Sequence, residues 1–95
     1  MAHYIIGLID VLDDEKYGAY VSSAPDLADF GAEVVAYDVS PQVIEGSMRR
    51  KRVGLVRFPS EEKFREWYDS PAYRAARQHR LSGGADVDMI LVQGL

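Results

Sequence analysis

The segment from Arg52 to Arg80 constrains the fold of this chain more than any other part of its sequence. It begins with the apolar, β-branched run Arg52–Phe58, which is typical of a strand. Pro59-Ser60 interrupts that run, and serine is a preferred cap for the aromatic-rich helix that the following spacing predicts. Ser70-Pro71, a cap with proline at the first helical position, predicts that a second helix starts there. The segment therefore predicts one strand followed by a broken helix.

The remaining sequence supplies the elements around this unit. A helix is expected from a cap at Asp13 or Asp14 to Phe30, broken at Pro25 and ended by Gly31 in the left-handed conformation. Further strands are expected at Tyr4–Val11, Glu33–Asp38 and Val87–Gly94, with Val43–Gly46 as a candidate for a short extended addition. The order βαββαβ within a single domain, residues 1–95, predicts a ferredoxin-like α+β fold. In that fold a four-stranded antiparallel sheet carries its helices on one face.

Two of the predicted strands are apolar on both faces. In Tyr4–Val11, Ile5 and Ile9 point to one side while Ile6 and Leu8 point to the other, and Val87–Gly94 repeats the pattern. Helices cover only one face of such a sheet, and soluble proteins rarely leave a large apolar surface exposed. We therefore expect a homodimer through the second face, which buries about 800 Å² per partner.

Composition excludes several classes of function. The 95 residues carry a formal net charge of −4, so a nucleic-acid partner is not expected. The basic run Arg49–Arg52 is interpreted as a solvated turn in preference to an anion-binding patch. There is no cysteine, which excludes disulfides and thiolate chemistry. No apolar run reaches the roughly 18 residues of a membrane span, and no basic residue precedes Lys16 as a signal peptide requires. A cytoplasmic protein without a membrane partner is expected.

Several motifs together resemble the domain-of-unknown-function family 1330. They are YIIGLIDV at 4–11, Tyr17 and Tyr20, Phe30-Gly31, Glu45-Gly46, Arg57-Phe58-Pro59-Ser60, the run from Trp67-Tyr68 through Ser70-Pro71 to Tyr73, and Arg80. The resemblance covers essentially the whole chain. It implies the dimeric α+β barrel superfamily, in which two sheets pack face to face. Distant members of that superfamily include cofactor-independent monooxygenases, haem-degrading enzymes, isomerases and ligand-sensing domains, so the fold does not select an activity.

Two glycines, Gly7 and Gly54, lie in the middle of strands that we expect to be parallel neighbours in the sheet. Glycine weakens a strand interior and often marks a need for space. Their absent side chains either leave the floor of a cavity or make room for Trp67 or Tyr73, and the second interpretation is favoured.

The broken helix contains the candidate ligand-binding residues. Trp67, Tyr68 and Tyr73 are most often core residues at this spacing, but their polar atoms need partners when buried. Arg80 lies seven residues beyond Tyr73, near the same helix face. An aromatic wall with an arginine suits an aromatic or carboxylate-bearing molecule. The alternative, slightly favoured, is a structural Arg80 that pairs with Glu45 or a helix C-terminal carbonyl.

Other polar groups are candidates of lower weight. Arg57 and Asp10 are expected at corresponding ends of neighbouring strands, where they would form an ion pair that lines the pocket. The acids Asp13–Glu15 are typical of a helix start, and His3 and His79 have no second ligand at a fixed spacing, so no metal site is expected. Haem-degrading relatives use a strand asparagine, and this chain has none. No cofactor is therefore expected.

Three functions remain open at this point. The first is binding of a small aromatic or anionic metabolite between sheet and helices, with Trp67, Tyr68, Tyr73, Arg80, Arg57 and Glu45 as contacts. The second is cofactor-independent oxidation or isomerisation of such a molecule. There Tyr73 or Tyr68 would donate a proton, Arg80 or Arg57 would stabilise an oxyanion, and Trp67 would stack. The third is a structural dimer that binds another protein.

Overall fold

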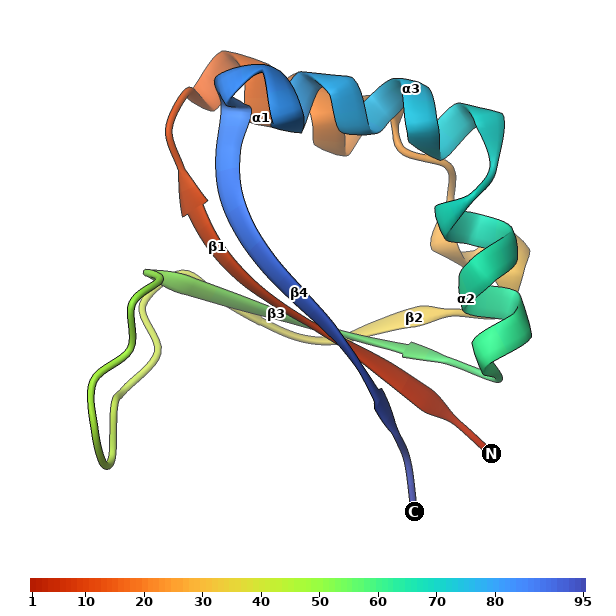
Figure 1. Cartoon of the computed structure of the whole chain (residues 1–95), viewed down its shortest axis with the longest axis horizontal. Helices are drawn as coiled ribbons and strands as arrows, with labels where there is room; N and C mark the ends of the chain where they lie inside the picture. Colours follow the sequence, from red (N-terminus) through yellow and green to blue (C-terminus); the bar gives the residue numbers. More distant parts are fainter.

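The computed structural model describes all 95 residues (Figure 1). The elements are β1 (His3–Val11), α1 (Asp14–Ser23), the 3₁₀ turn η1 (Leu27–Phe30), β2 (Glu33–Asp38), β3 (Arg52–Phe58), α2 (Glu61–Tyr68), α3 (Pro71–His79), the wide turn η2 (Arg80–Gly84) and β4 (Ala85–Gln93). The four strands form one sheet in the order β2-β3-β1-β4, and every neighbouring pair is antiparallel. The ferredoxin-like α+β fold predicted from the sequence is confirmed. No helix of the chain is long and apolar enough to cross a membrane.

The helix boundaries lie where the capping residues predict them. The side chain of Asp13 accepts a hydrogen bond from the backbone N–H of Lys16 at 3.0 Å, and Ser60 accepts one from Lys63 at 3.1 Å. Ser70 does the same for the backbone N–H of Tyr73 at 3.2 Å. Each cap satisfies a backbone donor that the first helical turn leaves unpaired. The first helix ends before Pro25, as expected, and Gly31 is left-handed with φ of 70°.

The expected parallel pairing of the first and third strands is wrong. β1 and β3 run antiparallel, with Gly7 directly opposite Gly54 and Tyr4 opposite Arg57. The β2–β3 hairpin reverses the chain, so β3 points against β1. Asp10 and Arg57 therefore lie at opposite ends of the pair, and the ion pair expected between them is not formed.

One face of the sheet packs against the helices and holds the core. Buried side chains from β1, β3, α2, α3 and the turn between η1 and β2 form a single aromatic-rich cluster. Its members are Ile5, Ala32, Phe58, Phe64, Trp67 and Tyr73. Figure 1 shows β1 and β4 curving beneath α1 and α3 while α2 closes one end of the sheet. Only 12 of 95 residues are buried, so the core of one chain is thin.

The other face, which we call the open face, has no helix over it. Ile6 of β1 lies between Leu55 of β3 and Ile90 of β4 there, in a row that crosses three strands. Ile90 is 53 % exposed and Val92, on the same strand and face, is 39 % exposed. An apolar face of this kind is what the two-sided strand pattern predicts.

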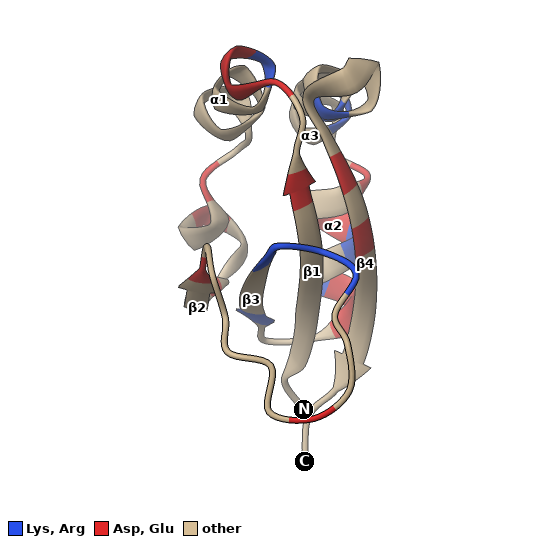
Figure 2. Ribbon diagram, turned by 90° about the vertical axis from the view of Figure 1, so that its left-hand side faces the viewer, with Lys and Arg blue, Asp and Glu red and all other residues tan.

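The loop between β2 and β3, residues 39–51, contains no strand, so the extended addition considered at Val43–Gly46 is absent. The loop extends away from the helices (Figure 1) and exposes Ile44 at 85 %. Its basic end crosses in front of β1 towards β4 (Figure 2).

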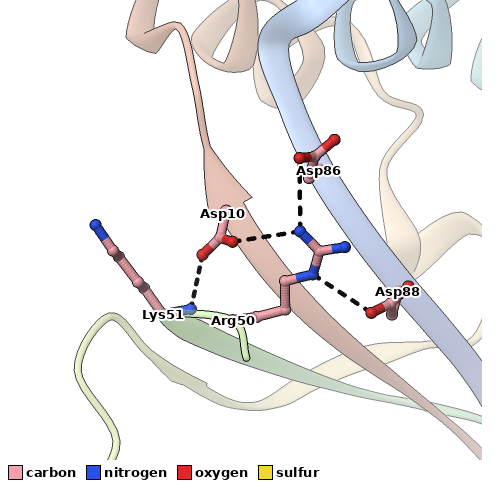
Figure 3. A network of polar contacts seen from close by, with 5 residues as sticks. All are labelled: Asp10, Arg50, Lys51, Asp86 and Asp88. Carbon is pink, nitrogen blue, oxygen red and sulfur yellow. Dashed lines mark hydrogen bonds and ion pairs between the residues drawn. The ribbon is translucent and has the colours of Figure 1, made fainter. Parts of the chain in front are cut away.

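Arg50 at the basic end of this loop is bound by acids from two strands (Figure 3). Its guanidinium lies 3.3 Å from Asp10 of β1 and 3.6 Å and 3.3 Å from Asp86 and Asp88 of β4. Asp10 also accepts a hydrogen bond from the backbone N–H of Lys51 at 2.8 Å. The basic run is therefore not simply a solvated turn, because Arg50 forms ion pairs with the three acids at this end of the open face.

Candidate functional site

A cavity of about 530 Å³ lies between the sheet and the α1–η1 segment. Fifteen of its twenty lining residues are hydrophobic, and they come from β1, β2, β3, β4, α1, η1 and α2. Its volume falls in the range of about 300–1,000 Å³ that is usual for small-molecule sites. The two carboxylates in its wall are Asp26 and Glu33, and the Asp26 side chain already accepts a hydrogen bond from the backbone N–H of Ala28 at 3.0 Å.

Gly7 and Gly54 form part of the cavity floor. A Cβ atom at Gly7 would lie 3.8 Å from the side chain of Ile9, and one at Gly54 would lie 3.5 Å from the ring of Tyr37. These are ordinary contact distances, so the glycines leave space rather than permit a close approach. The interpretation that Trp67 or Tyr73 fills this space is wrong, because neither ring is among the nearest atoms.

Trp67 and Tyr73 form the tightest aromatic pair in the chain. Their ring centroids lie 4.0 Å apart, and Trp67 also packs against Phe58 at 5.5 Å. The two rings have different environments, because Trp67 lines the cavity whereas Tyr73 is completely buried behind it. Ser70 positions both residues, because it accepts from the backbone N–H of Tyr73 and donates to the carbonyl of Trp67.

Tyr20 of α1 connects the cavity to that buried tyrosine. It lines the cavity, and its hydroxyl lies 2.8 Å from the hydroxyl of Tyr73. The guanidinium of Arg80 lies over the Tyr20 ring, 5.5 Å from its centroid. Tyr20 therefore stands between the cavity and the two residues that the sequence analysis selected.

Arg80 is a buried cation without an ion-pair partner. The residue is 8 % exposed, and no carboxylate lies within ion-pair distance of it. Its Nε atom is buried and has no hydrogen-bond partner. The pairing with Glu45 considered above is absent, because Glu45 lies in the exposed loop 39–51. No hydrogen bond to a helix carbonyl replaces it.

Burial changes the acid–base properties of these groups. Burial, and next the neighbouring Tyr73, raise the pKa of the Tyr20 hydroxyl well above its ordinary value. Burial and the neighbouring Tyr37 raise the pKa of Tyr17, which also lines the cavity, to about 12. Burial lowers the pKa of Arg80, but the hydroxyls of Tyr73 and Tyr20 more than compensate, so its pKa is raised. At neutral pH, Tyr17 and Tyr20 are therefore neutral phenols next to a permanent cation.

The other predicted site residues lie away from this cavity. Tyr68 packs beside Phe64 and under the guanidinium of Arg77, which is 4.5 Å from its ring, and it lines a separate, smaller pocket of about 230 Å³. Arg57 lies on the open face, opposite Tyr4. Glu45 is in the exposed loop. The structure thus brings together Trp67, Tyr73 and Arg80, and separates them from Arg57 and Glu45. Tyr68 packs against the ring of Tyr73, with centroids 5.5 Å apart, but it does not line the larger cavity.

Sequence reasoning did not select Tyr20 as a site residue. Tyr17 and Tyr20 lie three residues apart in the apolar stripe of the first helix, and a stripe of this spacing indicates packing against the sheet. Tyr20 could have been selected on chemical grounds, because a tyrosine in a buried helical stripe needs a hydrogen-bond partner for its hydroxyl. No group of three or more His, Cys, Asp or Glu side chains is placed to hold a metal ion.

The sequence matches the profile of a family described as "Domain of unknown function (DUF1330)" over residues 2–95. No curated protein matches the chain. Among solved structures it is similar to a protein of unknown function, RPA0582, from Rhodopseudomonas palustris. The TM-score is 0.80 at 22 % identity, over 99 % of this chain and 82 % of that one.

Two further structures share the fold. One is a dimeric ferredoxin-like protein of unknown function from Thermobifida fusca, with a TM-score of 0.60 at 17 % identity over 99 % of this chain and 92 % of that one. The other is SnoaB, described as a cofactor-independent oxygenase from Streptomyces nogalater. Its TM-score is 0.62 at 11 % identity over 99 % of this chain and 93 % of that one. At these identities the likeness shows the fold alone.

Proposed function

The chain belongs to the DUF1330 family, whose function is unknown, and on that premise we propose that it binds a small aromatic or anionic metabolite between the sheet and the helices. The observation that carries the proposal is the cavity of about 530 Å³, because an apolar space of this size remains unfilled by the chain's own side chains. Several of its lining residues, including Val21, Val34 and Tyr37, are about half exposed, so the cavity is open to solvent and accessible to a ligand.

The single tryptophan provides the test. Trp67 lines the cavity and gives the only indole N–H resonance in an NMR spectrum of the ¹⁵N-labelled protein. Titration with 2-naphthamide, a flat and neutral probe, is expected to shift that resonance in a saturable way. A resonance that does not move at about 1 mM probe, the concentration scale of very weak binding, would contradict the proposal.

We also propose that the chain is a homodimer through the open face. Apolar residues of three strands lie at least partly exposed there, and Arg50 pairs with the acids Asp10, Asp86 and Asp88 beside them. Asp86 and Asp88 are more than half exposed, so these charged groups suit the polar rim of a covered face, while the apolar row suits its centre. A second copy is the favoured occupant, since the exposed Ile44 of the loop gives each chain a further apolar contact beyond its own sheet.

Mass measurement tests the dimer. Light scattering after gel filtration is expected to give twice the mass of the 10.6 kDa chain. Ile90→Lys should give a folded monomer, because residue 90 is exposed in the single chain and buried in the proposed dimer. Leu81→Lys, at a residue 61 % exposed in η2, is the matched control and should remain dimeric. A wild-type monomer would contradict the dimer and leave the cavity proposal standing.

A second candidate is cofactor-independent oxidation or isomerisation in the same cavity. The Tyr20–Tyr73 hydroxyl pair next to Arg80 favours it, because neutral phenols can donate a proton and a cation can stabilise an oxyanion. A general base is less evident, since Asp26 and Glu33 are the only carboxylates in the cavity wall and Asp26 serves as a helix cap. Oxygen uptake with a panel of quinols, and turnover of lactones, should depend on Tyr73 and Arg80 if this candidate is correct. If neither probe binding nor turnover is found, the third candidate function remains, which is a structural dimer that binds another protein.

A further inference from the structure

The inner end of the cavity has more hydrogen-bond donors than acceptors. Two buried side-chain polar atoms in the chain lack a partner, Nε1 of Trp67 and Nε of Arg80. Both are donors that cannot accept, and both belong to the cluster around Tyr73. Trp67 lines the cavity, whereas Arg80 lies behind Tyr20 and does not line it, so this side of the cavity wall lacks an acceptor.

Arg80 has no anionic partner. Its neighbours are uncharged, namely the hydroxyls of Tyr73 and Tyr20 and the ring of Tyr20, whose centroid lies 5.5 Å from the guanidinium. These neutral groups stabilise the guanidinium but do not cancel its charge, and arginine stays protonated in proteins. A net positive potential therefore remains behind the Tyr20 part of the cavity wall.

The hydrogen-bonded hydroxyls of Tyr20 and Tyr73 lie between Arg80 and the cavity. Tyr20 and Tyr73 share one hydrogen bond of 2.8 Å, and either oxygen can be the donor. Tyr73 is completely buried and its hydroxyl has no other hydrogen-bond partner, so its O–H is satisfied only when Tyr73 donates to Tyr20. In that arrangement the Tyr20 hydroxyl, which belongs to a cavity-lining residue, presents a donor to whatever occupies the cavity.

We infer that the ligand of this cavity is an apolar molecule with one anionic oxygen group, a carboxylate or an enolate, which accepts a hydrogen bond from Tyr20 and is balanced by the charge of Arg80. The apolar body would lie on the floor made by Gly7 and Gly54. This inference rests on the proposed binding function and narrows its ligand class. It disfavours sugars and other predominantly polar molecules, because fifteen of the twenty lining residues are hydrophobic.

Two probes of the same shape but different charge test whether the cavity prefers an anionic ligand. Calorimetric titration with 2-naphthoate and 2-naphthamide compares an anionic and a neutral group on one ring system. Wild-type protein is expected to bind 2-naphthoate at least 10-fold more tightly, as is typical of hydrogen bonds to charged groups. Equal affinity for the two probes would overturn the inference but leave the binding function intact. Failure of both probes to bind would remove the binding function itself.

Substitutions test whether Arg80 and Tyr20 cause the preference for 2-naphthoate over 2-naphthamide. Arg80→Gln should reduce the preference for 2-naphthoate to less than about 3-fold, because the neutral side chain cannot balance the anion. Arg74→Gln, the same change at an exposed position of α3, is the control and should keep the full preference. Tyr20→Phe should weaken 2-naphthoate by about 10-fold through loss of one charge-assisted hydrogen bond. If Arg80→Gln does not fold, the wild-type comparison alone decides, and a preference that survives in folded Arg80→Gln overturns the role of Arg80.

Discussion

The hydroxyl of Tyr20 lies 2.8 Å from the hydroxyl of Tyr73, and this one bond joins α1 to α3 at the inner end of the cavity. Tyr73 is completely buried, whereas Tyr20 lines the cavity. The bond therefore connects the core of the chain to its candidate binding site.

Tyr73→Phe should destabilise the chain by about 1 kcal/mol, the usual net value of one hydrogen bond, because the ring still fills its space. Urea unfolding measures the change. Tyr37→Phe removes a hydroxyl that accepts from Arg52 at the exposed edge of the sheet, and should have an effect of less than about 0.5 kcal/mol. In a double-mutant cycle, the costs of Tyr20→Phe and Tyr73→Phe should not add; full additivity would show that the bond contributes nothing.

Stability should fall at high pH because of the buried phenols. The pKa of Tyr17 is raised from 10.0 to about 12, so folding favours its neutral form. Below pH 10 both the folded and the unfolded chain keep the proton, and the contribution is complete. Between pH 10 and pH 12 only the unfolded chain loses it, so stability is lost as pH rises through this window. Urea midpoints on both sides of pH 10 test this, and Tyr17→Phe should show a smaller fall than wild type.

Arg50→Met should destabilise the chain, because it leaves Asp10, Asp86 and Asp88 without their shared cation. The expected loss is small, since Asp86 and Asp88 are more than half exposed and solvent screens them. The difference from wild type should shrink at about 1 M salt, where the screening length is only about 3 Å. Arg49→Met, at an exposed neighbour, is the control; an equal effect there would rule out the ion cluster as the cause.

Gly54→Val should weaken binding of 2-naphthamide by at least about 10-fold with little loss of stability. The valine side chain would enter the cavity from its floor, and a Cβ at this position makes only ordinary contacts. Valine also suits a strand better than glycine does. Calorimetry and urea unfolding on the same preparation separate the two effects. Unchanged affinity would show that the probe does not occupy the cavity.

Much of the fold was predictable because its signals are local. The caps Asp13, Ser60 and Ser70 and the left-handed Gly31 each act within a few residues, and all four have the predicted role. The apolar residues on both sides of β1 and β4 likewise predicted that one sheet face would be apolar without a helix over it, but not which face packs on the helices. Strand direction was wrong for β1 and β3, because the local pattern of a strand is the same whichever way its neighbour runs.

The sequence by itself determined the elements, their order and the apolar character of both sheet faces. Only the tertiary structure decided which polar groups meet. The reversal of β3 separated Arg57 from Asp10, and the β2–β3 loop brought Arg50 to Asp10 instead. Packing of α1 on α3 set Tyr20 between the cavity and Arg80. The physical reason is one of range: capping and periodicity act over about four residues, whereas these contacts join side chains 40 to 60 positions apart.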